Sequence, residues 1–284
     1  MLEALGAPLI SPIAPTSAIA WPIKVDVLGV GVSLTTYEEC TRLILKAAAG
    51  RQSALVVCQA VHGVVTASRD LSYRSQLNEF EIVAPDGQPV RWAVNLLHGA
   101  RLQRRVYGPE LMLRLCAAAA DSGVGIYLYG GSPRSIELLQ ENLLSRFPAL
   151  AIAGYESPPY RPLTSDEDEL VVERINASGA GLVFIGLGCP KQDHFAIAHR
   201  DRLHGVQVCV GAAFDFHAGI KSTAPAWMQD RGLEWLFRLY QEPGRLWRRY
   251  LVTNTLFVLG VARQWIAMRC GAASTHIEGH DIHD

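Results

Sequence analysis

Short runs rich in valine, isoleucine and leucine alternate with longer segments of helical periodicity along most of this chain. A short strand followed by a helix and another strand is typical of βαβ units, which build a mainly parallel sheet. Several of the runs are apolar at nearly every position, as expected for strands that helices cover on both faces. The alternation therefore predicts an α/β, Rossmann-like fold with a mainly parallel sheet and helices on both faces.

The pattern also predicts the individual elements. The expected strands cover residues 25–30, 54–57, 81–84, 125–129, 151–153, 182–186 and 206–210. The expected helices cover residues 36–48, 61–69, 88–98, 109–122, 133–146, 166–177 and 191–200. Ser165 is the expected N-cap of the helix at 166–177, whose first turn is acidic. We prefer this explanation of residues 166–168 to a metal-binding DxD motif.

The chain of 284 residues fits one large α/β domain with an appendage. We expect a flexible lead-in over residues 1–23, an α/β core over 24–222, a helical appendage over 223–270 and a disordered tail over 271–284. Pro243-Gly244 should divide the appendage into two helices. Whether these helices form a mobile lid or a fixed part of the core stays open.

Charge is distributed unevenly along the chain. The net charge of -1 gives no general attraction to nucleic acid. Seven arginines lie between Arg231 and Arg269, which indicates either a surface for phosphate or anionic lipid or a solvated helix face. Polar residues interrupt the longest apolar stretch, residues 250–268, so we expect it to lie on a membrane without crossing it. The six cysteines form no CxxC pair, which is typical of a reducing cytoplasm.

Three glycine-bearing loops follow predicted strands. They are Gly130-Gly131-Ser132-Pro133, Gly186-Leu187-Gly188-Cys189-Pro190-Lys191-Gln192 and Gly211-Ala212-Ala213-Phe214-Asp215. In open parallel sheets, ligands bind beyond the carboxyl ends of the strands. Glycine lets the backbone approach a phosphate there, and the next helix offers its N-terminal N–H groups. The three loops together predict a ligand of the nucleotide type.

Two further segments carry side chains suited to catalysis. Asp86 comes just after a predicted strand, where a carboxylate could take the proton of an acceptor hydroxyl. The alternative, that Asp86 only forms a turn before Gly87, stays open. Arg104 and Arg105 precede another helix and could clamp a diphosphate through charge-assisted hydrogen bonds.

Six segments together resemble the WecG/TagA/CpsF family of bacterial glycosyltransferases, in order from about residue 25 to residue 257. They are the three glycine-bearing loops and Ala84-Pro85-Asp86-Gly87, Arg105-Val106-Tyr107-Gly108 and Glu234-Trp235-Leu236-Phe237-Arg238-Leu239. The resemblance implies an inverting transferase that uses a UDP-sugar and needs neither a metal nor another cofactor. The sugar would be glucose, N-acetylmannosamine or its uronic acid. The acceptor would be a polyprenyl-diphosphate-linked saccharide of exopolysaccharide or cell-surface polysaccharide synthesis.

The resemblance also implies partners and a location. We expect a cytoplasmic protein bound peripherally to the anionic inner face of the membrane, with no nucleic-acid partner. A homo-oligomer is left open.

By the same resemblance, Asp86 is the catalytic base and Arg105 binds the diphosphate. The residues expected around the donor are Gln59, Gly130, Gly131, Gly186, Gly188, Lys191, Gln192 and Asp215. The arginines expected at the acceptor and diphosphate are Arg238, Arg245 and Arg248.

The chain departs from the family pattern at three positions. Gln59 stands where asparagine is usual, Glu110 where aspartate is usual, and Asp193 where glutamate is commoner. These departures leave the sugar open.

Two other functions are weighed against the transferase. One is an NAD(P)-binding Rossmann oxidoreductase, although Gly29-Val30-Gly31-Val32-Ser33-Leu34 lacks the third glycine of the dinucleotide fingerprint. The other is a non-catalytic protein that binds a UDP-sugar.

Overall fold

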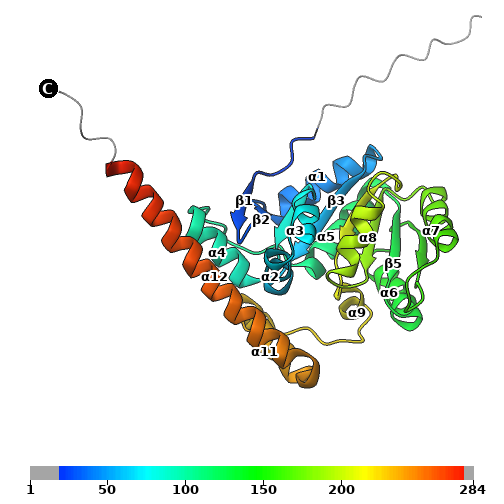
Figure 1. Ribbon diagram of the computed structural model, residues 1–284. Helices are drawn as coiled ribbons and strands as arrows, with labels where there is room; N and C mark the ends of the chain where they lie inside the picture. The colour runs from blue at the N-terminus through cyan, green and yellow to red at the C-terminus, as the bar shows by residue number, and fades with distance from the viewer. Residues whose placement is uncertain (1–18, 278–284) are drawn as a thin grey trace, which may run out of the picture.

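A six-stranded sheet with the order β4-β3-β8-β7-β5-β6 forms the centre of the computed structural model, which describes residues 19–277 without the side chains of residues 245 and 272–277 (Figure 1). All neighbouring strands are parallel. The strands are β3 (Ala54–Gln59), β4 (Ile82–Pro85), β5 (Ile126–Gly130), β6 (Ile152–Glu156), β7 (Leu182–Gly186) and β8 (Val206–Cys209). The predicted parallel sheet is therefore confirmed.

Helices cover both faces of this sheet because alternate side chains of each strand point to opposite sides. Val56 of β3 packs with α1 (Tyr37–Ala49), α5 (Gly108–Ser122) and α6 (Pro133–Arg146). Its neighbour Val57 packs in the other core cluster. The helices of that face are α2 (Val61–Arg69), α3 (Leu71–Asn78), α4 (Gln88–His98), α7 (Ser165–Ala177) and α8 (Lys191–Ala198). The predicted Rossmann-like layering is thus confirmed.

The prediction of one strand over residues 25–30 was wrong. The segment forms a hairpin of two antiparallel strands, β1 (Lys24–Val27) and β2 (Val30–Ser33), outside the six-stranded sheet. Leu28 and Gly29 form the turn with φ of 56° and 87°, the positive values that a tight hairpin requires. The glycines of the dinucleotide-like segment therefore belong to a hairpin, and no strand-to-helix loop is formed there to hold a diphosphate.

The start of α7 also differs from the prediction. Thr164 is the N-cap, and its hydroxyl accepts a hydrogen bond from Glu167 N while the Glu167 side chain accepts one from Thr164 N. Ser165 is the first helical residue because only Thr164 stands three residues before this glutamate, as a capping box requires. Two short helices, α3 and α9 (Ala213–His217), were not predicted.

The appendage consists of α10 (Ala226–Asp230), α11 (Glu234–Gln241) and α12 (Pro243–Ile277). The predicted break at Pro243 is confirmed, whereas α10 was not predicted. The tail was expected from residue 271, but α12 continues to Ile277. Residues 1–18 of the expected lead-in and residues 278–284 of the expected tail lie outside the described residues.

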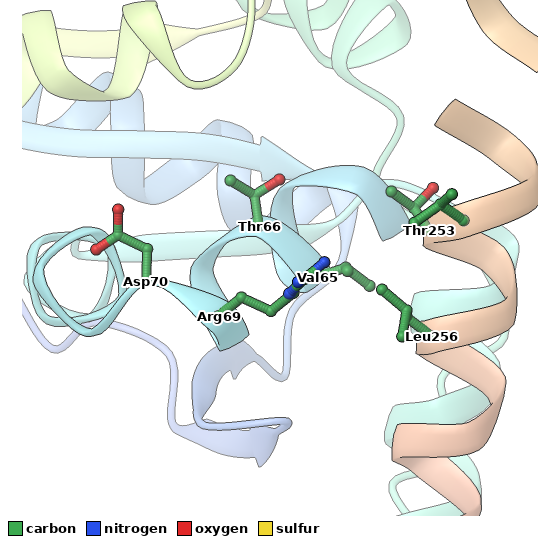
Figure 2. Close-up of a pocket in the computed structure, with 7 residues that line it drawn as sticks. Val65, Thr66, Arg69, Asp70, Thr253 and Leu256 are labelled. Atoms are coloured by element: carbon green, nitrogen blue, oxygen red, sulfur yellow. The ribbon is translucent and has the colours of Figure 1, made fainter. Parts of the chain in front are cut away.

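Helix α12 crosses α2 and α4, and its carboxyl end extends beyond the core (Figure 1). Phe257 and Val261 are buried in the core cluster of that face. Where α12 crosses α2, a hollow of about 300 Å³ remains between Val65, Arg69 and Leu256 (Figure 2). The helix is thus packed on the core along one side.

The expectation that α12 is unable to cross a membrane needs correction. Leu246–Gly271 is long and apolar enough to do so by length and composition, and only 17% of its most apolar window is buried. Single polar residues such as Asn254 and Gln264 do not lower the mean hydropathy of this stretch enough to exclude a membrane span. Because one side of the helix packs on the core, this apolarity by itself is weak support for membrane association.

Candidate active site

A cleft of about 2020 Å³ lies over the carboxyl ends of β3, β4, β5, β7 and β8. The chain leaves β5 through α6 on one face of the sheet and leaves β7 through α8 on the other. Ligands of open α/β sheets bind at such a switch point. The volume exceeds the roughly 300–1,000 Å³ of ordinary small-molecule sites, so the cleft has room for two substrates.

The glycine-bearing loops after β5, β7 and β8 pack directly against one another. A Cβ atom on Gly130 would lie 2.6 Å from the carbonyl carbon of Gly186. A Cβ atom on Gly186 would lie 2.6 Å from the Phe214 ring. The N–H of Gly131 donates to the carbonyl of Gly186 over 3.2 Å. Glycine is therefore required at these positions by close packing; Gly131 and Gly186 line the cleft, whereas Gly130 lies outside the lining.

The loop after β7 brings polar groups to the cleft. Gly188, Lys191 and Gln192, which the resemblance places around the donor, all line it. Gln192 is 4% exposed, and its Oε1 has no hydrogen-bond partner in the described part of the chain. A buried amide oxygen without a protein partner is unfavourable, so it is available to a ligand N–H or O–H.

Asp215 lines the cleft, and its carboxylate already has two partners within the protein. Its carboxylate accepts a hydrogen bond from the hydroxyl of Ser135 over 3.0 Å and pairs with Lys221 at 2.9 Å. These contacts join α6 to α9. The structure therefore gives Asp215 a bracing role that the sequence did not indicate.

Asp86 lies at the end of β4, where its N–H donates to the carbonyl of Gln59 over 3.1 Å. Arg105 Nη1 donates to the Asp86 carbonyl over 3.2 Å and lies 3.9 Å from its Oδ1. Gly87 is the N-cap of α4, and no side chain caps that helix. The Asp86 carboxylate thus faces the cleft beside Arg105.

The surroundings of Asp86 shift its acidity. The pKa of Asp86 is raised to about 7, and burial is the largest cause. Arg105 and Arg238 oppose this rise, and the negative charge of Glu234 contributes to it. A carboxyl with a pKa near neutrality exchanges protons readily at physiological pH, as a general base must.

Arg105 also binds the appendage, which the sequence did not predict. Its Nη2 donates to Oε2 of Glu234 over 2.5 Å, and both side chains are 11% exposed. The guanidinium lies 4.3 Å from the centroid of the Tyr107 ring. Glu234 opens α11, so this buried ion pair connects the appendage to the predicted catalytic residues.

Gln59 takes part in a buried hydrogen-bond network. Its Nε2 donates to Asp193 Oδ2 over 3.0 Å and to the hydroxyl of Tyr73 over 3.2 Å. Tyr73 in turn donates to Asp193 Oδ2 over 2.5 Å. Two departures from the family pattern, a longer amide at Gln59 and a shorter acid at Asp193, are therefore in contact. Gln59 lines the cleft, and its amide nitrogen holds the first turn of α8.

The predicted appendage arginines have different positions. Arg238 lines the cleft, whereas Arg248 is exposed, outside the cleft lining, and lies over the Trp247 ring. The side chain of Arg245 lies outside the described part of the structure. Arg249 also lines the cleft and lowers the pKa of His62, although burial is the larger cause. Its position one residue after Arg248 turns it to another side of α12.

Two carboxylates of the DxD-like segment, those of Glu167 and Asp168, are engaged in protein contacts. Asp168 pairs with Arg202 at 2.7 Å and with His199 at 2.9 Å, and Glu167 pairs with Arg161 at 2.6 Å. Within residues 19–277, no group of three His, Cys, Asp or Glu side chains could hold a metal ion.

The doubly wound sheet and the polar cleft over its carboxyl edge define a Rossmann-like protein of the type that binds nucleotides at a switch point. The chain belongs to the Glycosyl transferase WecG/TagA/CpsF family, whose sequence model matches residues 25–271. The match extends from β1 through most of α12, so the appendage lies within the part of the chain that the family model covers. The family supports transferase activity in cell-surface polysaccharide synthesis, with a nucleotide-sugar donor and a lipid-linked acceptor in general terms.

Proposed function

We propose that this protein moves a sugar from a UDP-sugar to a polyprenyl-diphosphate-linked saccharide at the cytoplasmic face of the membrane. The sugar is glucose, N-acetylmannosamine or its uronic acid. The observation that carries the proposal is the placement of Asp86, a half-buried carboxyl whose pKa is raised to about 7, beside Arg105 in a cleft large enough for two substrates.

The chemistry is a single displacement. The Asp86 carboxylate takes the proton of an acceptor hydroxyl while the hydroxyl oxygen bonds to the anomeric carbon of the donor. The bond between that carbon and the diphosphate oxygen breaks, and UDP leaves with the bonding electrons. An α-linked donor gives a β-linked product, because the acceptor attacks from the side opposite to the leaving group.

Cationic side chains stabilise the departing diphosphate. Lys191, Arg238 and Arg249 line the cleft from three different helices. Arg105 also lines the cleft and can contribute to this stabilisation, although its charge is partly neutralised by the ion pair with Glu234. Charge-assisted hydrogen bonds from such groups can supply the stabilisation that other transferases obtain from a metal ion. We therefore expect activity to survive excess EDTA.

Membrane attachment is part of the proposal. Exposed apolar side chains gather on the appendage, with Trp227 54%, Trp247 48% and Leu251 63% exposed. Arg248 is exposed on the same helix as Trp247 and Leu251. An amphipathic surface of this composition suits the boundary of an anionic bilayer.

The test is incubation of the purified protein with a panel of UDP-sugars and a short-chain prenyl-diphosphate-linked saccharide. A mass increase of one sugar on the acceptor, with release of UDP, supports the proposal. Binding of a UDP-sugar without transfer to any acceptor would favour a non-catalytic binding protein. Bound NAD(P) and oxidation of a reduced nicotinamide would instead support the oxidoreductase alternative.

A further inference from the structure

We propose that a groove between α4 and α12 holds the first part of the acceptor's prenyl chain. The inference rests on the proposed function, because it assigns a subsite to the lipid-linked acceptor. It adds a path by which the apolar chain leaves the polar cleft.

The two helices run side by side in the same direction. Helix α4 begins next to Asp86 and ends at His98, whose ring nitrogen contacts the carbonyl of Asp26 at 2.7 Å. Gln264 of α12 reaches the same carbonyl at 3.1 Å. Tyr250, two turns after the start of α12, lines the catalytic cleft. Both helices therefore lead from the cleft to the β1–β2 hairpin.

Each helix presents one stripe of side chains to the space between them. The lining residues from α4 are Gln88, Pro89, Trp92, Ala93 and Leu96. The lining residues from α12 after Tyr250 are Thr253, Asn254, Phe257, Val258, Val261 and Ala262. Both sets recur at intervals of three to four residues, so each occupies one helical face. The α4 stripe is about 12 Å long from Gln88 to Leu96 at 1.5 Å per residue.

Polarity falls along the groove. The end next to the sheet carries the cations Arg105, Arg238 and Arg249 beside the acids Asp86 and Glu234. None of the lining residues contributed by α4, or by α12 after Tyr250, is charged. A ligand with an anionic diphosphate at one end and a hydrocarbon chain at the other matches this order. A wholly polar saccharide would leave the apolar half without a partner.

The apolar half is open to a ligand. Leu96 is 57% exposed and Val258 is 64% exposed, one on each side of the groove. Trp92 is 47% exposed, and a Cβ atom on Gly232 would lie 2.9 Å from its indole. The absence of a side chain at Gly232 lets the loop before α11 hold this indole at the groove.

The bilayer itself is a second apolar medium that could cover these side chains. Leu259 distinguishes contact with a bilayer from binding of a prenyl chain in the groove. It is 63% exposed on α12 beside Val258 but does not line the cleft. Contact with a bilayer would involve Val258 and Leu259 alike, whereas a chain held in the groove would contact Val258 alone.

The experiment compares binding of farnesyl diphosphate and inorganic diphosphate by the full-length protein in the absence of membranes. The variants are Leu96→Gln and Val258→Gln, with Leu259→Gln as the matched control. We expect the wild-type protein to bind farnesyl diphosphate more tightly than inorganic diphosphate. In each groove variant the ratio of these two affinities should fall about tenfold, because apolar burial is lost. The control should keep the preference, and affinity for inorganic diphosphate should stay constant throughout.

The proposal is overturned if the wild-type protein binds both diphosphates equally. It is also overturned if the groove variants keep the preference, or if Leu259→Gln loses as much. All three substitutions are at exposed positions, and thermal unfolding shows whether each variant is folded. The measurement needs neither a donor nor turnover, so failure of the sugar-transfer assay leaves its outcome intact.

Discussion

Asp86 comes directly after β4, and Gln192 lies in the first turn of α8, after β7. Both follow strands of the sheet, and both line the cleft. Their position could be predicted because side chains just beyond parallel strands gather at one edge of a sheet. The surroundings of Asp86 could not be predicted in the same way. Its neighbour Arg105 pairs with Glu234, which lies more than a hundred residues further along the chain. Arg248 lies outside the cleft lining while Arg249 lies in it, because one residue turns a helix by more than a quarter of a turn.

The acidity of Asp86 predicts a pH dependence of transfer. The base acts as the carboxylate, and the pKa of Asp86 is raised to about 7 by burial. The value of kcat/KM should therefore rise about tenfold per pH unit below pH 7 and level off above it. Initial rates between pH 5 and pH 9 measure this profile. A rate that is constant from pH 5 to pH 7 would contradict the assigned protonation.

The contact between Gln59 and Asp193 predicts energetic coupling. Gln59→Asn shortens the amide and should break its 3.0 Å hydrogen bond to Asp193, while Asp193→Glu alone should crowd the buried network. Together the two substitutions keep the summed length of the two side chains, because one loses a methylene group and the other gains one. We expect the double variant to recover stability, with a coupling of about 0.5–3 kcal/mol in unfolding experiments. Strict additivity of the two losses would show that the pair does not act together.

At the level of elements, the sequence predicted the parallel strands and their helices well because hydrophobic periodicity reports burial directly. The hairpin β1–β2 was missed because residues 25–30 are apolar except for Asp26 and Gly29, and only Gly29 signals the turn. The length of α12 was underestimated at its carboxyl end, because the side chains of residues 266–271 that lead to it are exposed and give no helical periodicity of apolar residues.

Helix α11 is coupled to the site through Glu234, and this coupling predicts a shift in the pH profile. The negative charge of Glu234 raises the pKa of Asp86, so Glu234→Gln should lower it and move the midpoint of kcat/KM to lower pH. The exposed Glu137, which pairs with Arg134 on α6, provides the control Glu137→Gln. A lower rate with an unmoved midpoint would mean that Glu234 only anchors α11.

At the scale of the whole molecule, the appendage places apolar and cationic side chains next to the opening of the cleft. Leu251 is 63% exposed on α12, two residues after Arg249, which lines the cleft. An enzyme attached through this surface would face a lipid-linked acceptor directly. The sequence indicated the composition of this surface, whereas its place beside the cleft depends on the packing of α12 on α2 and α4.

This arrangement predicts salt-dependent membrane binding. The protein should bind anionic vesicles better than neutral ones, with binding weakening as salt rises because each arginine near the surface contributes about 1 kcal/mol. Leu251→Glu should reduce binding further by placing a charge in the apolar contact. Vesicle sedimentation measures both effects. Equal binding to neutral and anionic vesicles would contradict the role of the arginines.

The central claim is that Asp86 is the base of a sugar transfer. The most direct test measures Asp86→Asn beside the wild-type protein, with the UDP-sugar donor and a short-chain lipid-linked acceptor. The asparagine keeps the size of the side chain but accepts no proton, so transfer should fall by about 10²–10⁴-fold while the affinity for the UDP-sugar stays close to the wild-type value. Transfer at a near-normal rate by Asp86→Asn would contradict the account.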